Sequence, residues 1–167
     1  IPVCKHFPGQ GSASGDSHEG LVDVTNTWHK SELKPYQTLI NYDSIKAIMT
    51  SHLIHKKLDA NLPATLSSRV LKDLLRSKMG FNGVIISDDP SMGAISKYYS
   101  LKETLLLMIN AEVDMFCFGN NLHYDENLLK KVFKILVDLY EEEKITENQI
   151  HASYERIMAL KKSIGII

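Results

Sequence analysis

The chain alternates short apolar runs with longer amphipathic segments, and this rhythm constrains its fold more than any other feature of the sequence. Residues 1–5, 47–53, 84–87 and 113–118 are apolar runs of strand length. Amphipathic segments of helix length stand between them; in the segment 67–79 the apolar residues fall on one helical face. Strand, helix, strand at this spacing indicates right-handed βαβ units. We therefore predict an α/β fold with a parallel sheet of about four strands.

Local signals place the ends of two helices. Either Ser67 or Ser68 can cap the start of the helix that follows them, and Gly80 can supply the left-handed residue that ends it. Thr146 followed three residues later by Gln149 is a capping box, which predicts the start of the last helix.

Composition and charge exclude several classes of protein. The 167 residues are 44% hydrophobic and 23% charged, which is typical of a globular chain and not of a disordered or membrane-spanning one. Nineteen Lys and Arg against twenty Asp and Glu give a net charge of −1. This balance gives no electrostatic reason to expect nucleic acid or a membrane surface as a partner. We expect a cytoplasmic protein, with an exported form as the alternative.

Polar side chains cluster where the predicted strands end. In chain order they are Lys5, His6, His52, Asp88, Asp89, Asn120 and Asn121. Because the carboxyl ends of parallel strands meet at one edge of a sheet, and ligands bind there, these residues form a candidate site. Each has a plainer explanation when taken alone. A histidine near a strand end is often a core residue, and an Asp pair before Pro90 can cap the next helix.

A glycine-rich stretch over residues 9–20 follows the first predicted strand and must be a loop. Within it, Asp16 stands two residues before His18. A carboxylate at this spacing can hold the imidazole in one tautomer and raise its basicity. The alternative is a turn residue beside an exposed histidine. The glycines could also cradle a phosphate, although the fixed spacing of a P-loop or a dinucleotide fingerprint is absent.

Several of these motifs occur together in a known family. Residues 5–11, KHFPGQG, followed by SASG and DSH, resemble the signature of family 3 glycoside hydrolases of the bacterial β-N-acetylhexosaminidase type, whose usual form is KHFPGHG, four residues, DSH. The segments 48–95 and 111–121 resemble those that follow in that family, whereas residues 122–167 match only as helices. Gln10 stands where the family usually has His, and Pro90 where Leu is more usual.

The resemblance implies a retaining glycosidase that removes terminal β-N-acetylglucosamine from peptidoglycan-derived sugars through a covalent glycosyl-enzyme. By position in the motifs, Asp88 would be the nucleophile, His18 the general acid and base, and Asp16 the group that orients His18. Asp89 is expected to be structural. The carbohydrate substrate would be bound by Lys5, His6 and His52. We expect no metal and no cofactor.

The resemblance also implies that the chain is part of a larger domain. The family's catalytic domain is similar to a TIM barrel of typically about 250 residues. Residues 1–167 would be a partial family 3 catalytic domain: the C-terminal half of a TIM (β/α)8 barrel with its terminal helices. We therefore expect exposed strand edges and an uncovered apolar face. These would bind the N-terminal half of the same barrel or a second copy of the chain.

Two other functions stay open on the sequence. The chain could be a non-catalytic half-barrel that keeps only part of a sugar-binding site. It could also be a metal-dependent hydrolase, because histidine and aspartate are ligands of Zn²⁺, although no fixed ligand spacing such as HExxH is present. The ligands would come from His6, Asp16, His18, His52 and Asp88.

Overall fold

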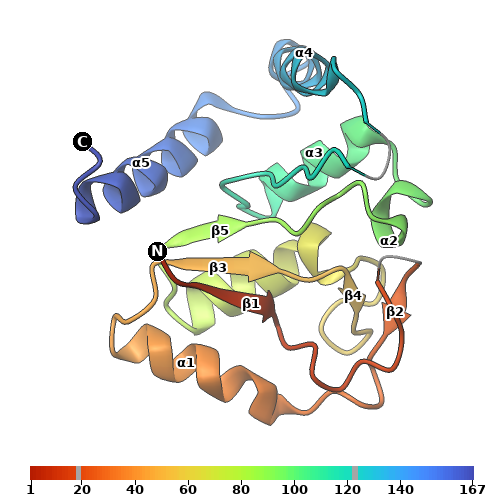
Figure 1. The fold of residues 1–167 in the computed structure, drawn as a ribbon, viewed down its shortest axis with the longest axis vertical. Coiled ribbons are helices and arrows are strands. Elements are labelled where there is room, and N and C mark those ends of the chain that lie inside the picture. Colours follow the sequence, from red (N-terminus) through yellow and green to blue (C-terminus); the bar gives the residue numbers. More distant parts are fainter. Residues whose placement is uncertain (18–19, 122–123) are drawn as a thin grey trace.

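Three parallel strands form the central sheet of the computed structural model (Figure 1). In spatial order they are β1 (Val3–Phe7), β3 (Ala47–Thr50) and β5 (Val84–Ile86). Ile48 of β3 pairs with Ile85 of β5, and both are fully buried. The predicted α/β class with a parallel sheet is confirmed. The structure describes residues 1–17, 20–121 and 124–167.

Strand β1 carries one extra residue. On β1, two residues, Lys5 and His6, lie between the paired residues Cys4 and Phe7, whereas β3 supplies only one residue over the same interval. This irregularity is a β-bulge, a feature that bends a strand locally and re-aims its side chains. Lys5 and His6 therefore leave the regular alternation at the carboxyl end of β1.

A second, smaller sheet was not predicted. It pairs β2 (Val22–Asp23) with β4 (Leu53–Ile54) in parallel. The single strand predicted over 47–53 is therefore wrong in its second half, because the chain leaves the main sheet after Thr50 and pairs with the segment that returns from the glycine-rich loop. Val22, Leu53 and Trp28 pack together in a small apolar cluster beneath this pair.

Helices surround the main sheet, with α1 on one side and α3 and α5 on the other in Figure 1. Two short 3-10 turns, η1 and η2, and one π-helix, η3, accompany five α-helices in the described residues. In chain order the helical elements are η1 (Lys30–Leu33), α1 (Lys34–Asn41), η2 (Ala64–Leu66), η3 (Arg69–Lys78), α2 (Gly93–Ser96), α3 (Leu101–Asn110), α4 (Leu128–Glu141) and α5 (Glu147–Ser163).

The helix ends agree with the local signals in the sequence. Val70 N donates a hydrogen bond to Ser67 Oγ at 3.1 Å at the start of η3, and Gly80 beyond its end has a φ of 76°. Gln149 N donates to Thr146 Oγ1 at the start of α5, and Thr146 N donates back to Gln149 Oε1, which completes the capping box. The periodicity did not predict that η3 is a π-helix.

The apolar run 113–118 does not form the fourth regular strand that the sequence predicts. Only Ile86 and Met115 make a bridge between this segment and β5. Side chains take the place of backbone partners on both sides of this bridge. Asp114 Oδ2 accepts the N–H of Ile85 at 2.8 Å, and Ser87 Oγ accepts the N–H of Cys117 at 3.0 Å. The segment follows the sheet edge without a continuous ladder.

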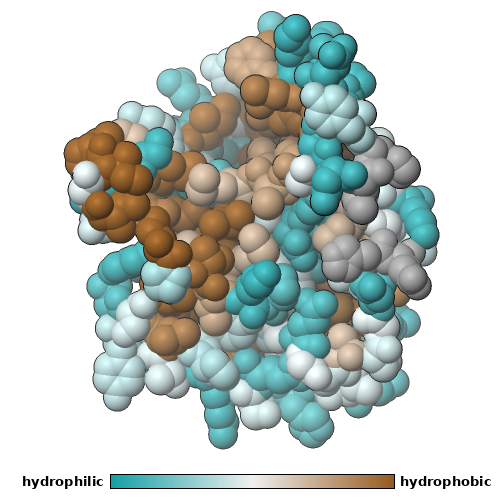
Figure 2. Space-filling view, viewed as in Figure 1, coloured by the Kyte–Doolittle hydropathy of each residue, from teal (hydrophilic) through white to brown (hydrophobic). Residues whose placement is uncertain are grey.

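An apolar face is left uncovered, as expected from the sequence. A groove of about 670 Å³ runs between α3, α4 and α5. Phe133, Tyr140, Ile150 and Tyr154 line it and are 67%, 48%, 49% and 53% exposed. Figure 2 shows apolar surface extending over the α5 side of this view. Across the described residues, no helix combines the length and apolar character needed to cross a bilayer.

Candidate active site

Asp88 lies at the carboxyl end of β5, where the chain turns away from the sheet. Its backbone N–H donates to Thr50 Oγ1 at 3.3 Å, which ties the turn to the end of the neighbouring strand β3. Its Oδ1 accepts the N–H of Asp89 at 2.9 Å. The side chain keeps 21% of its surface exposed. Asp88 is therefore a carboxylate that is oriented by the backbone and still reachable.

His6, from the bulge in β1, faces this carboxylate. His6 Nε2 lies 3.8 Å from Asp88 Oδ2, too far for a direct hydrogen bond. Burial lowers the pKa of His6 below its ordinary value, the Asp88 carboxylate acts to raise it, and Lys5 acts to lower it. Burial therefore favours the neutral ring, which can donate one hydrogen bond. The neighbouring Lys5 is exposed, and both peptide bonds Lys5–His6 and Phe7–Pro8 are cis.

Asp89 has a different environment from Asp88. Its Oδ1 accepts the N–H of Ser91 at 2.8 Å, and its Oδ2 accepts the N–H of Gly119 at 3.0 Å. A Cβ on Gly119 would lie 2.7 Å from that Oδ2, so a side chain at position 119 would displace this carboxylate from its present position. Both carboxylate oxygens of Asp89 are thus occupied by backbone donors, which agrees with the structural role expected from the sequence.

His52 lies beneath the turn and not on the surface of the site. Only 1% of its surface is exposed, and its Nε2 lies 2.9 Å from the backbone carbonyl oxygen of Asp89. Burial lowers the pKa of His52, whereas this hydrogen bond and the carboxylates of Asp88 and Asp89 act to raise it. The structure therefore brings His52 to the site but places its ring out of reach of a sugar.

The glycine-rich loop is fastened at its base. Trp28 Nε1 donates to the carbonyl oxygen of Pro8 at 3.1 Å, and Ser12 Oγ donates to Glu32 Oε1 at 2.7 Å. Gly9 has a φ of 125°, and a Cβ there would lie 2.6 Å from Glu32 Oε2. The loop therefore leaves the bulged strand β1 in a defined direction.

Asp16 is exposed in this loop, and Ser17 beside it is buried. His18, the predicted general acid and base, lies outside the described residues. The predicted pairing of Asp16 with His18 therefore stays a prediction from the sequence.

Asn120 on the rim, and Thr50, which the sequence analysis missed, have structural contacts. Asn120 Nδ2 donates to the carbonyl oxygen of Asp125, and its Oδ1 accepts the N–H of Asp125, so this side chain closes its own loop. Thr50, which holds the N–H of Asp88, was missed because it lies inside an apolar run. A polar residue at a buried strand end was the available signal. Its hydroxyl also contacts that of Thr65.

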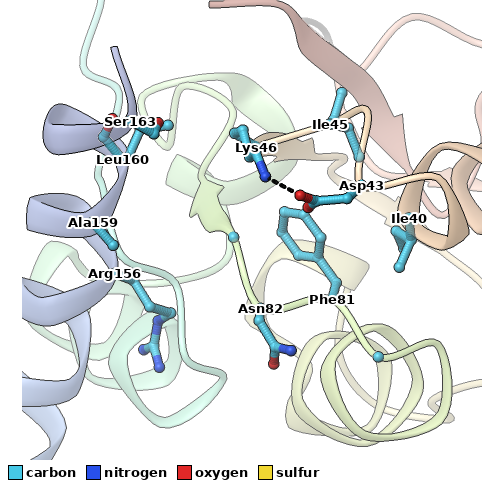
Figure 3. A pocket seen from close by; sticks show the side chains of 12 residues that line it. Ile40, Asp43, Ile45, Lys46, Phe81, Asn82, Arg156, Ala159, Leu160 and Ser163 are labelled. Atoms are coloured by element: carbon cyan, nitrogen blue, oxygen red, sulfur yellow. Dashed lines mark hydrogen bonds and ion pairs between the residues drawn. The ribbon is translucent and has the colours of Figure 1, made fainter. Parts of the chain in front are cut away.

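A separate cavity of about 370 Å³ lies between the C-terminal part of α5, the turn at 80–83 and the residues after α1 (Figure 3). Its charged side chains already have partners. Lys46 Nζ pairs with Asp43 Oδ2 at 2.5 Å, and Arg156 pairs with Asp114 at 2.8 Å. It lies toward the amino ends of the strands, whereas parallel sheets bind ligands at the carboxyl ends. We therefore place the candidate site at Asp88.

Across residues 1–17, 20–121 and 124–167, no group of three His, Cys, Asp or Glu side chains is placed to hold a metal ion. We do not propose a metal centre.

Residues 1–160 match the family model described as the glycosyl hydrolase family 3 N terminal domain. The chain is 37% identical over 130 residues to a β-hexosaminidase of Methylobacillus flagellatus, a match that covers 76% of this chain and 37% of the relative. It is similar in fold to CbsA from Thermotoga neapolitana, with a TM-score of 0.88, 29% identity, and coverage of 98% of this chain and 36% of that one.

A third match is the β-N-acetylglucosaminidase from Thermotoga maritima, with a TM-score of 0.79 and 33% identity. It covers 95% of this chain and 34% of that chain. The chain thus spans about a third of the length of these relatives.

Proposed function

The chain belongs to glycosyl hydrolase family 3, and on that premise we propose that it carries the nucleophile of a retaining glycosidase. The substrate would be a sugar with a terminal β-linked N-acetylglucosamine, such as a peptidoglycan fragment. The names of two relatives, β-hexosaminidase and β-N-acetylglucosaminidase, support this choice of sugar. The observation that carries the proposal is the Asp88 carboxylate, oriented at the carboxyl end of β5 and facing His6.

In the proposed first step, Asp88 Oδ2 attacks the anomeric carbon while the bond to the leaving-group oxygen breaks. The hydrogen bond from Asp89 N–H to Oδ1 fixes the orientation of the carboxylate. A general acid protonates the leaving oxygen. Water then attacks the glycosyl-enzyme, gives up its proton to the same residue acting as a base, and releases Asp88.

We assign the acid and base role to His18, with Asp16 as the group that orients it. The support is the DSH motif. An imidazole is compatible with a nearby nucleophilic carboxylate, because it avoids the like-charge repulsion that raises the pKa of one member of a carboxylate pair. His6 and Lys5 would donate hydrogen bonds to sugar hydroxyls. Their place on the bulge beside Asp88 supports this role.

We further propose that residues 1–167 form the second half of a TIM barrel. The N-terminal half of the same barrel would then cover the apolar groove between α3, α4 and α5. Two observations support this: the exposed aromatic and aliphatic side chains in the groove, and the length of the relatives. The alternative, a non-catalytic half-barrel that self-associates, is decided by measuring the activity and the molar mass of the chain in solution.

The test is hydrolysis of an aryl N-acetyl-β-glucosaminide by the full-length protein, with the first-formed sugar anomer followed by NMR. A β anomer is expected, because two displacements at the anomeric carbon restore its configuration. An α anomer would overturn the retaining mechanism. Absence of hydrolysis for both N-acetylglucosaminides and glucosides would overturn the glycosidase assignment.

A further inference from the structure

Among the described residues, His52 makes one hydrogen bond, and the chemistry of that bond fixes the state of the ring. Its partner is the carbonyl oxygen of Asp89, which can only accept, so His52 Nε2 must carry the proton. His52 Nδ1 is buried and has no hydrogen-bond partner among the described residues. Since burial disfavours the charged ring, His52 is a neutral histidine with a defined tautomer.

The bond from His52 reaches the residue that orients the nucleophile. Asp89 is held at its carbonyl oxygen by His52 and by the N–H of Met92 at 3.1 Å. Its carboxylate is held by the N–H groups of Ser91 and Gly119. The backbone N–H of the same residue donates to the Asp88 carboxylate. Asp89 is thus fixed on several sides, and His52 is the side chain from the β3–β4 connection that fixes it.

Because His52 is buried, its contact with Asp89 is distinct from any contact with substrate. A hydroxyl of a sugar cannot reach a ring of which 1% is exposed. The neighbouring His6, by contrast, keeps 26% of its side chain exposed and faces Asp88 directly. Among the described residues, His6 and His52 therefore lie in two layers near the nucleophile, His6 in the site and His52 below it.

We propose that His52 is a positioning residue, whose Nε2–H holds the Asp89 carbonyl and thereby sets the orientation of the Asp88 carboxylate for attack. This inference rests on the proposed function and replaces the substrate-binding role predicted for His52. It assigns no contact between His52 and the sugar. Loss of the hydrogen bond should therefore reduce the rate of the chemical step and leave substrate affinity unchanged.

Two amides of different length test the geometry. In His52→Gln the amide nitrogen can reach the position of Nε2, whereas in His52→Asn it reaches only that of Nδ1. In the full-length protein, His52→Asn should lower kcat by about 10- to 100-fold and change KM by less than about twofold, because a small misplacement of a reacting group is costly. His52→Gln should retain kcat within about threefold. His151→Asn, at a histidine whose side chain is 67% exposed, is the matched control.

Equal kcat values for the Asn and Gln variants, or a rise in KM at constant kcat, would overturn the proposal. Should His52→Asn not fold, NMR of the imidazole nitrogens in the unmodified protein decides. Protonation at Nε2 at neutral pH is expected, and protonation at Nδ1 would overturn the proposal. An active protein that Asp88→Asn silences and His52→Asn leaves unchanged refutes this inference alone. An inactive unmodified protein refutes the proposed function.

Discussion

Asp114 and Asp88 both lie beside strand β5, and their surroundings differ in nearly every respect. Asp114 has a side chain with no exposed surface. Its Oδ2 accepts from Arg76 Nη2 at 2.7 Å and from the N–H of Ile85 at 2.8 Å, and its Oδ1 accepts from Arg156 Nε at 2.8 Å and from Ser153 Oγ at 2.9 Å. This carboxylate joins η3, β5 and α5, and its oxygens are fully engaged.

Asp88, at the carboxyl end of the same strand, has a single backbone donor on Oδ1 among the described contacts, a histidine 3.8 Å from Oδ2, and a side chain that is 21% exposed. The contrast separates the two uses of a carboxylate in this fold. Charged partners on both oxygens hold Asp114 as part of the structure. Partial exposure and fewer donors leave Asp88 able to form a bond with a substrate. Four predictions test this division.

The largest effect is expected at the exposed aspartate. Asp88→Asn removes the proposed nucleophile, so kcat on an aryl N-acetylglucosaminide should fall on the order of 10⁴-fold or more. The free energy of unfolding should change by less than about 1 kcal/mol, because the site is partly exposed. Steady-state kinetics and urea unfolding of the full-length protein measure the two quantities. Retained turnover would place the nucleophile elsewhere.

The next largest effect is expected at His18, and the size of the rate loss should depend on the leaving group of the substrate. His18→Gln removes the proposed acid, so turnover of substrates with a poor leaving group should fall by roughly 100-fold or more. Substrates with an activated phenol as leaving group need little protonation and should lose much less in the first step. Comparing kcat/KM for an alkyl and a dinitrophenyl glycoside measures this. Equal losses on both would contradict the role of His18.

The buried aspartate should give the opposite result. Asp114→Asn leaves Arg76 and Arg156 without their shared anion, which should lower the free energy of unfolding by about 3–5 kcal/mol. The kcat of the folded protein should stay unchanged. Asp43→Asn is the control: its side chain is 84% exposed and pairs with Lys46, so a change below about 1 kcal/mol is expected. If both variants cost the same, the Asp114 contacts do not stabilise the fold.

The smallest expected effect is a loss of stability at acidic pH. Burial lowers the pKa of His6, His52 and His55 below the ordinary value of 6.5. Below this pH the unfolded chain binds protons that the folded chain does not, so the free energy of unfolding should fall as the pH falls below 6.5. The slope per histidine cannot exceed about 1.4 kcal/mol per pH unit. Urea unfolding at several pH values measures it.

His52→Gln should reduce this acid slope, since it removes one of the three histidines with a lowered pKa. An unchanged slope in the variant would show that His52 does not contribute to the acid sensitivity.

Features that depend on near neighbours in the chain could be predicted from the sequence. The capping box at Thr146 and the left-handed Gly80 involve residues within one turn, and the structure contains both. The irregular segment 113–118 could not be predicted, because the groups that replace its ladder, Asp114 and Ser87, act through packing between distant segments.

The candidate site divides in the same way. Because the carboxyl ends of parallel strands meet at one edge of a sheet, the sequence predicted that His6 and Asp88 lie together. In the structure, His6 Nε2 lies 3.8 Å from Asp88 Oδ2. The same reasoning placed His52 beside them but could not predict that its ring is buried. Its burial depends on the connection between β3 and β4, where the chain changes sheets after Thr50.

Because of the bulge, the register of β1 against β3 depends on the number of residues between Cys4 and Phe7. Counted from Cys4, regular pairing would bring Phe7 opposite Ser51, whereas the bulge brings it opposite Thr50. If one residue between Cys4 and Phe7 were deleted, the strand could keep Phe7 buried in the core or keep Lys5 and His6 directed toward the site, but not both. Anyone who grafts this pair of residues onto another parallel sheet must transfer the insertion with them.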